Sequence, residues 1–206
     1  MPAHPKPTPT RPELILLDVM STLVYDPFRV EMPAFLGLTF EELLDQKHPH
    51  AWAEFEAGEI DEESFYLKFF RDGRALDGPG LKAAMARHYE WLPGMQEVLT
   101  QLSECGVPMH VLSNYPLWYE QVERATGLSR YVPWTFVSCH TGLRKPAPES
   151  FLEPARQLGI QPGACLLIDD NHENIAAAEA LGMDAIPFQN AVALTHELAT
   201  RGLLGE

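Results

Sequence analysis

Short runs of apolar residues that end in polar, chemically capable side chains recur along the chain. The run Leu14–Leu17 ends at Asp18, and later runs end at Ser113–Asn114 and at Asp169–Asp170. Runs of this length predict buried strands, and a parallel strand that is covered on both faces needs no alternation of apolar and polar positions. Ligands of open α/β sheets bind beyond the carboxyl ends of the strands. We therefore expect these polar residues to face a common reaction centre; the alternative for Asp18 alone is a residue that only caps the next element.

Between the apolar runs, apolar residues recur at the spacing of amphipathic helices. In the segment 93–106, Met95, Val98, Leu99 and Leu102 share one helical face, and a glycine supplies the stop. Strands that alternate with helices of this length predict an α/β fold with a Rossmann-like parallel sheet covered on both faces. The expected helices span residues 93–106, 115–125, 148–158, 172–181 and 192–200, and the expected strands span residues 13–18, 107–113, 131–139, 164–170 and 184–188.

Residues 28–87 show only helical patterns. Thr39 and Glu42 have the spacing of a capping box, in which each side chain bonds the backbone N–H of the other residue. Residues 24–33 are expected to be irregular because two prolines interrupt them. The expected helices span residues 41–47, 50–56, 62–71 and 81–89. We predict a small helical cap over residues 28–87, an α/β core over residues 13–27 and 88–206, and a proline-rich, disordered tail over residues 1–12.

Composition and charge narrow the class of protein. The 206 residues carry 29 acidic against 15 basic side chains, a formal net charge of -14. This balance argues against the basic surface that binding of nucleic acid requires. No apolar run approaches the roughly 20 residues that span a bilayer, and no secretory leader is recognisable, so we expect a cytoplasmic protein with no membrane partner. Cys105, Cys139 and Cys165 lack the spacing of a zinc site or a disulfide framework and are interpreted as buried thiols.

The order of the candidate residues is itself informative. An aspartate after the first strand, a serine after the second, the lysine of Arg144–Pro146 and a final acidic pair resemble the four sequence motifs of the haloacid dehalogenase-like (HAD) hydrolase superfamily. Each motif alone is weak evidence, because such residues are individually typical of turns, loops and helix N-caps. Their common order and spacing cover nearly the whole chain. The resemblance implies a HAD core with a small inserted cap and hydrolysis at a nucleophilic aspartate.

The resemblance assigns phosphoryl chemistry to four residues. It implies that Asp18 attacks the phosphoryl group of a small-molecule phosphomonoester and forms an aspartyl-phosphate. Lys145 would neutralise the charge of Asp18 and the phosphate. Ser113 and the backbone amide of Asn114 would hydrogen-bond the phosphoryl oxygens.

The resemblance also implies a magnesium site. Mg²⁺ prefers oxygen ligands and would be held by Asp18, the backbone carbonyl of Met20 and the acidic pair Asp169 and Asp170. Consecutive residues at the end of a strand diverge, so the two aspartates of the pair are not expected to contact the metal equally. We favour Asp170 as the ligand and Asp169 as a group near Lys145.

One position departs from the phosphatase pattern. Phosphatases of the superfamily carry a second acid two residues after the nucleophile, which protonates the leaving oxygen and later activates water; this chain has Met20 there. A thioether can do neither, so Tyr25, Asp26 or a cap residue would have to replace the acid.

Two alternative functions follow from the missing acid. Haloacid dehalogenases also lack it and work without metal, which makes a metal-independent 2-haloacid dehalogenase-like hydrolase one alternative. A non-catalytic protein that binds phosphate or flavin is the other. An acidic pair beside Asp18, offset only by Lys145, favours a metal and therefore phosphate chemistry.

Within the superfamily the chain is similar to the plant plastid flavin mononucleotide (FMN) hydrolases. The similarity lies in Asp18–Leu23, Asp26–Phe28, Ser113–Tyr119 and Trp134–Phe136, among other segments. That group also has methionine two residues after the nucleophile, and the resemblance implies cleavage of FMN to riboflavin and phosphate. Trp118 and Tyr119 are candidate substrate contacts, whereas aromatic residues at helical spacing in the cap are expected to form the core of the cap itself.

Overall fold

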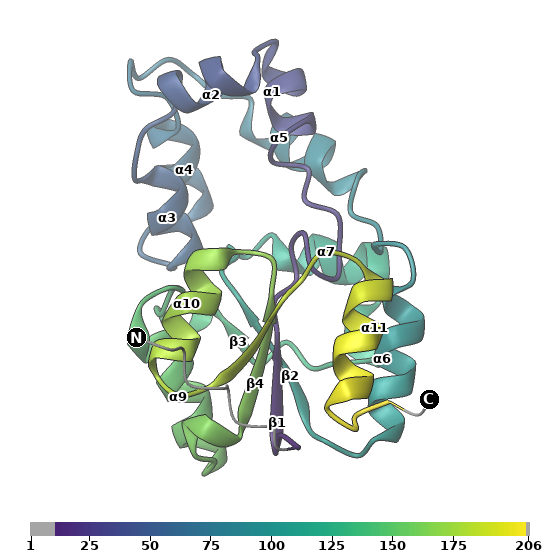
Figure 1. The fold of residues 1–206 in the computed structure, drawn as a ribbon. Coiled ribbons are helices and arrows are strands. Elements are labelled where there is room, and N and C mark those ends of the chain that lie inside the picture. Colours follow the sequence, from purple (N-terminus) through teal and green to yellow (C-terminus); the bar gives the residue numbers. More distant parts are fainter. Residues whose placement is uncertain (1–10, 205–206) are drawn as a thin grey trace, which may run out of the picture.

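A computed structural model describes residues 11–204 and contains a five-stranded sheet with helices on both faces (Figure 1). The strands lie in the order β3-β2-β1-β4-β5, and all neighbours are parallel, as the sequence predicts. The strands are β1 (Leu14–Leu17), β2 (Met109–Ser113), β3 (Phe136–Val137), β4 (Cys165–Asp169) and β5 (Asp184–Pro187). The helices of the core are α6 (Met95–Glu104), α7 (Tyr119–Thr126), η1 (Leu128–Arg130), α8 (Ser138–Thr141), α9 (Pro148–Leu158), η2 (Pro162–Ala164), α10 (His172–Ala180) and α11 (Ala191–Thr200).

The central strand β1 is buried on both faces because its alternate residues belong to two apolar clusters. Ile15 and Leu17 share one cluster with residues of α6 and α11. Leu14 and Leu16 share the other with residues of α9 and α10. None of the four side chains has exposed surface, which explains an apolar run without alternation. The next residue, Asp18, therefore lies at the carboxyl edge of the sheet.

One predicted strand is much shorter than expected. Within residues 131–139, only Phe136–Val137 pair with β2, because the helical turn α8 begins at the next residue, Ser138. Pro133, which has no backbone N–H to donate to a ladder, lies before the paired residues. Helix α9, in contrast, begins and ends where the sequence predicts.

Five short helices form a separate layer beyond the carboxyl edge of the sheet, and the chain rises from β1 into this layer (Figure 1). The capping box is present, since Thr39 Oγ1 accepts a bond from Glu42 N (3.2 Å) and Glu42 Oε2 accepts one from Thr39 N (2.8 Å). Pro33 lies inside a helix, contrary to prediction, because a proline in the first turn lacks only an N–H that would have no helical partner. The helices are α1 (Glu31–Leu36), α2 (Phe40–Gln46), α3 (Ala51–Glu56), α4 (Glu62–Lys68) and α5 (Gly78–Ala86). The domain boundaries at residues 28 and 87 stay a prediction, and most of the predicted tail lies outside the described residues.

Aromatic side chains join these cap helices to the core. Phe55 and Phe65 stack with ring centroids 4.6 Å apart, and Trp118 of the core packs edge-on against both at 5.6 and 5.9 Å. Trp52 packs against Trp118 and against Tyr115, which follows β2. The expectation that the cap aromatics form a core is confirmed, but this core extends across the junction.

An ion pair lies beside the aromatic cluster. Glu56, at the end of α3, accepts bonds from Nε and Nη2 of Arg144 at 2.9 and 2.6 Å, and Trp52 donates to its other oxygen. Its backbone oxygen accepts a bond from Ser138 of α8. Burial raises the pKa of Glu56 to about 7, although Arg144 acts to lower it.

The cysteines and the helix lengths bear on two further expectations. All three cysteines are free; Cys165 is buried, whereas Cys105 and Cys139 are only half-buried, so the prediction of buried thiols holds for Cys165 alone.

No helix between residues 11 and 204 is both long and apolar enough to cross a bilayer. A cytoplasmic location and the absence of a nucleic-acid partner stay predictions.

Alanine at Gly58 is expected to destabilise the protein more than alanine at Gly73. Both glycines have φ near +70°, so each substitution carries the same left-handed penalty, about 1–2 kcal/mol. A Cβ on Gly58 would lie 2.5 Å from the carbonyl oxygen of Cys139 in α8, whereas one on Gly73 would meet no atom within 4 Å. We expect an additional cost of about 1–3 kcal/mol for Gly58→Ala in urea denaturation. Equal costs would contradict the close approach of α3 to α8.

Glu56→Gln is expected to weaken the pH dependence of stability. The pKa of Glu56 is higher in the folded protein than in the unfolded chain. As pH falls from about 7 towards 4.5, Glu56 therefore takes up a proton in the folded protein but not in the unfolded chain, and this stabilises the fold. The unfolding free energy of the wild type should therefore rise, relative to Glu56→Gln, by about 1–3 kcal/mol between pH 8 and pH 5. Urea denaturation at both pH values measures this double difference, and a value of zero would mean that the pKa of Glu56 is not raised.

Candidate active site

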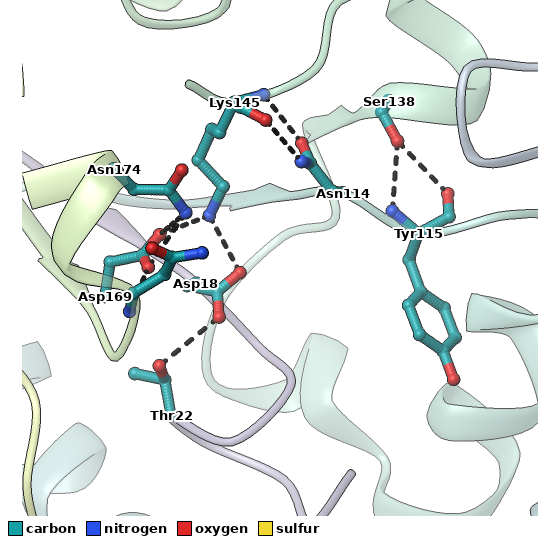
Figure 2. Close-up of polar contacts among 9 residues, drawn as sticks. Asp18, Thr22, Asn114, Tyr115, Ser138, Lys145, Asp169 and Asn174 are labelled. Atoms are coloured by element: carbon teal, nitrogen blue, oxygen red, sulfur yellow. Dashed lines mark hydrogen bonds and ion pairs between the residues drawn. The ribbon is translucent and has the colours of Figure 1, made fainter. Parts of the chain in front are cut away.

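Two carboxylates from adjacent strands share the ammonium group of Lys145 (Figure 2). Asp18 follows β1 and Asp169 ends β4, so the pairing of these strands brings both side chains to the same edge of the sheet. Lys145 Nζ lies 2.8 Å from Asp18 Oδ1 and 2.5 Å from Asp169 Oδ2, and all three residues are buried. Thr22 Oγ1 donates a bond of 3.3 Å to Asp18 Oδ2.

The two members of the acidic pair have different surroundings. Asp169 has no exposed surface, and its oxygens accept bonds from Asn174 Nδ2 (3.0 Å to each) and from the backbone N–H of Asn171 (2.9 Å), in addition to Lys145. Asp170 is exposed. The bonds to Asp169 fix its orientation, whereas Asp170 is accessible to a ligand from solution.

The oxygen atoms at this edge suit a hard divalent cation. One carboxylate oxygen each from Asp18, Asp169 and Asp170 lie within 4.8 Å of one another. Two ligands of a magnesium ion with bonds of about 2.1 Å are at most about 4.2 Å apart, so a small inward adjustment would bring these oxygens onto one ion. The group contains no nitrogen or sulfur ligand of the kind that softer metals prefer. The donor set therefore fits Mg²⁺.

The backbone of Lys145 is held by the side chain of Asn114. Asn114 Nδ2 donates to the carbonyl oxygen of Lys145, and Asn114 Oδ1 accepts from its N–H, both at 2.8 Å (Figure 2). Asn114 follows β2, the neighbour of β1, so Ser113 at the end of β2 lies at the same edge of the sheet as Asp18. Ser113 is buried, and its hydroxyl makes no hydrogen bond to another residue in the described range 11–204.

Burial and mutual repulsion disfavour full ionisation of the acidic residues. Burial raises the pKa of Asp18 to about 7, Lys145 opposes this rise, and Asp169 and Asp170 add to it. Burial and Asp169 likewise raise the pKa of Asp170. Burial lowers the pKa of Lys145, but Asp18 and Asp169 outweigh it, so that pKa is raised and the lysine stays charged. One buried cation thus faces three acids, an excess of negative charge that a divalent cation would relieve.

Met20 offers a backbone oxygen but no acid. Its side chain is nearly buried in the apolar cluster that contains Leu23 and Val24. No residue in the described part of the chain donates a hydrogen bond to its carbonyl oxygen. Ser21, which follows, has φ 60°, an uncommon value for a residue with a side chain, and the chain turns sharply there.

Trp118 and Tyr119 are not among the residues that gather around Asp18. Trp118 has no exposed surface, and its indole N–H donates to Glu62 Oε1 at 2.8 Å, so it belongs to the interior rather than to a surface open to substrate. Tyr119 is half-buried, with its hydroxyl 3.1 Å from Nε2 of His140. In this conformation Trp118 lies inside the aromatic cluster, and contact of Trp118 or Tyr119 with substrate stays a prediction.

Sequence analysis missed two neighbours of the site, Thr22 and Asn174. Thr22 lies four residues after Asp18, and Asn174 lies five residues after Asp169 in the first turn of α10. Both are short polar residues next to a predicted site residue and at a helix start or turn, a position that is usually explained by capping. The signal in the sequence that could identify Thr22 and Asn174 is that each lies a few positions after a predicted site residue.

Comparison with known proteins agrees with the resemblance inferred from the motifs. The family model for haloacid dehalogenase-like hydrolases matches residues 14–182. The chain is 45% identical over 190 residues to the chloroplastic flavin mononucleotide hydrolase 1 of Arabidopsis thaliana. The match covers 92% of this chain and 78% of the plant protein. It is 26% identical to the sesquiterpene phosphatase astK of Aspergillus oryzae, over 75% of this chain and 79% of that one.

Solved structures show the same fold. A HAD family enzyme of Bacteroides thetaiotaomicron, in complex with magnesium and inorganic phosphate, superposes with a TM-score of 0.71 at 21% identity, covering 88% of this chain and 95% of that chain. Together with the family model, which spans most of the sequence, these similarities establish that the chain belongs to the haloacid dehalogenase-like hydrolases.

Proposed function

We propose that the protein is a Mg²⁺-dependent phosphomonoesterase that hydrolyses FMN to riboflavin and phosphate. The observation that carries the reaction class is the buried ammonium group of Lys145 shared by Asp18 and Asp169, with the exposed Asp170 beside them. The high identity to the plant FMN hydrolase supports the substrate.

Asp18 is proposed as the nucleophile. Its Oδ2 is bonded only by Thr22 at 3.3 Å among the described residues, which leaves lone pairs for attack on phosphorus. Lys145 orients the carboxylate through Oδ1 and offsets the charge that builds up during phosphoryl transfer. Ser113, whose hydroxyl is uncommitted within the described residues, and the backbone amide of Asn114 are proposed to hydrogen-bond the phosphoryl oxygens.

The metal ligands are proposed to be Asp18, Asp170 and the backbone carbonyl of Met20. A bound Mg²⁺ would supply neutralisation of the phosphate charge and align the phosphoryl group. Asp169, saturated by hydrogen bonds, is proposed to act mainly by holding Lys145 between the two carboxylates.

The metal-independent dehalogenase is the weaker candidate. Without a metal, Asp18, Asp169 and Asp170 would depend on Lys145 alone for compensation, at a buried site where unpaired charge is costly. A dehalogenase would also leave the exposed Asp170 without a role in the chemistry.

The purified protein is expected to release phosphate and riboflavin from FMN in equal amounts when Mg²⁺ is present. Asp18→Asn removes the nucleophile and should lower the rate by about 10³-fold or more, and EDTA should abolish it. Asp72→Asn, at an exposed cap residue, is the matched control and should leave the rate unchanged. A phosphate-release assay over a panel of phosphomonoesters measures these rates.

The alternatives give different results in the same preparation. Chloride release from 2-chloropropionate without metal would support the dehalogenase. Tight FMN binding without turnover would support the non-catalytic protein. Phosphate release that Asp18→Asn leaves unchanged would contradict the nucleophile.

Asp170→Asn is expected to remove most of the stabilisation by magnesium. A ligand that binds only the folded state at 100 times its dissociation constant adds about 2.7 kcal/mol, which raises the melting temperature. Asp170 is exposed, so its substitution should leave the metal-free protein folded. Thermal melts with and without MgCl₂ measure the effect, with the exposed neighbour Glu173→Gln as a control; an equal shift in Asp170→Asn and wild type would exclude Asp170 as a ligand.

A further inference from the structure

The site lacks the acid that would protonate the leaving oxygen. Met20 occupies its usual place and cannot transfer a proton. If the proposed phosphatase function holds, another group near the site must exchange protons with the leaving alcohol and with water. Tyr25, Asp26 and the buried cap residue Glu56 are titratable groups on the segments that meet at the junction of core and cap.

Two of these groups are already committed. The Tyr25 hydroxyl bonds both carboxylate oxygens of Glu31, at 3.1 and 2.9 Å. Glu56 accepts from Arg144 on one oxygen and from Trp52 on the other. A carboxylate whose two oxygens both accept hydrogen bonds, or a hydroxyl that already donates its proton, has to break these bonds before it can exchange a proton with a substrate.

Asp26 is the uncommitted member of the three. Its Oδ1 accepts a bond of 3.0 Å from the backbone N–H of Phe28, and no residue within the described chain bonds its Oδ2. The segment that carries it is fixed on both sides. Before Asp26, Ser21 N donates to Val24 O (2.8 Å) and Tyr25 N donates to Glu90 O (2.9 Å); after it, Met32 N donates to Pro27 O (3.1 Å). Asp26 is half-buried in this segment, which leads from β1 into the cap.

The path of the chain places Asp26 where it leads from the sheet edge into the cap, two residues after Val24, which pairs with Met20. Its carboxylate interacts with Asp170 of the core, and it raises the pKa of Glu56 and of Tyr115. Burial raises the pKa of Asp26 itself; the bond from Phe28 N and the charge of Arg29 oppose this rise, and Asp170 adds to it. An aspartate in these surroundings carries a proton closer to neutral pH than a solvated one does.

We propose that Asp26 is the general acid and base of the reaction, in place of the residue that Met20 replaces. As Asp18 attacks phosphorus and the bond from phosphorus to the ester oxygen breaks, the Asp26 carboxyl gives its proton to that oxygen, and the alcohol leaves. The Asp26 carboxylate then takes a proton from water as the water oxygen attacks the aspartyl-phosphate. The bond from phosphorus to Asp18 breaks, and phosphate leaves with both aspartates restored.

Asp26→Asn is the discriminating variant because asparagine keeps the acceptor for Phe28 N but cannot transfer a proton. FMN has an alcohol leaving group that needs protonation, whereas p-nitrophenyl phosphate has one that leaves as an anion. We expect kcat/KM, which reports transfer to Asp18, to fall about 10²-fold or more for FMN and less than about threefold for p-nitrophenyl phosphate. With the second substrate the variant should also release a burst of nitrophenolate, since hydrolysis of the aspartyl-phosphate lacks its base.

Asp45→Asn is the control, the same change at an exposed cap residue that has no proposed chemical role; it should leave the ratio of the two kcat/KM values unchanged. An equal loss with both substrates in Asp26→Asn, or no loss with FMN, would overturn the role of Asp26 while the wild type still showed the phosphatase activity. A wild type that releases phosphate from no phosphomonoester would overturn both the proposed function and this role.

Discussion

The structure depends on the burial of one ammonium group between two carboxylates. Lys145, Asp18 and Asp169 are all shielded from water, and buried charges are tolerated only when they are paired and hydrogen-bonded. Most of the local architecture serves this requirement: Asn114 holds the lysine backbone on one side, and Asn174 holds Asp169 on the other. The same arrangement leaves net negative charge at the sheet edge, which is the property that suits the site to a divalent cation and a phosphate ester.

The site is assembled from residues that are remote in sequence, and the order of the strands brings them together. Asp18 and Lys145 are separated by 127 positions, yet both lie at the edge formed by β1 and its neighbours β2 and β4. Closing a loop of this length costs chain entropy, which strand pairing and core packing have to offset. The candidate site therefore depends on the pairing of β1 with β2 and β4, and its residues span positions 18 to 174.

Local sequence signals predicted the parts of the molecule that local physics determines. The buried strand before Asp18, the capping box at Thr39 and the helix from Pro148 to Leu158 each follow from spacing and composition within a few residues. The candidates Asp18, Ser113 and Asp169 were identified because each stands at the end of an apolar run. The convergence of Asp18 and Asp169 on Lys145 follows only from the resemblance, since spacing alone does not pair a loop residue with a partner 24 positions away.

The sequence does not predict contacts between residues that are far apart in the chain. The contact of Trp118 with Glu62 spans 56 positions, and no local pattern in the sequence predicts it. The pairing of Glu56 with Arg144 spans 88 positions and was likewise invisible. The strand predicted over residues 131–139 is too long for a different reason. Its residues have strand propensity, but α8 begins where the pairing with β2 would continue.

The aromatic cluster between cap and core limits how substrate can enter. Swinging the cap away from the core would separate Trp118 from Phe55 and Phe65 and would expose part of these side chains, which now have little or no exposed surface. A small displacement of the turn after Asp18 would leave this aromatic contact intact, whereas a hinge motion of the entire cap would break it.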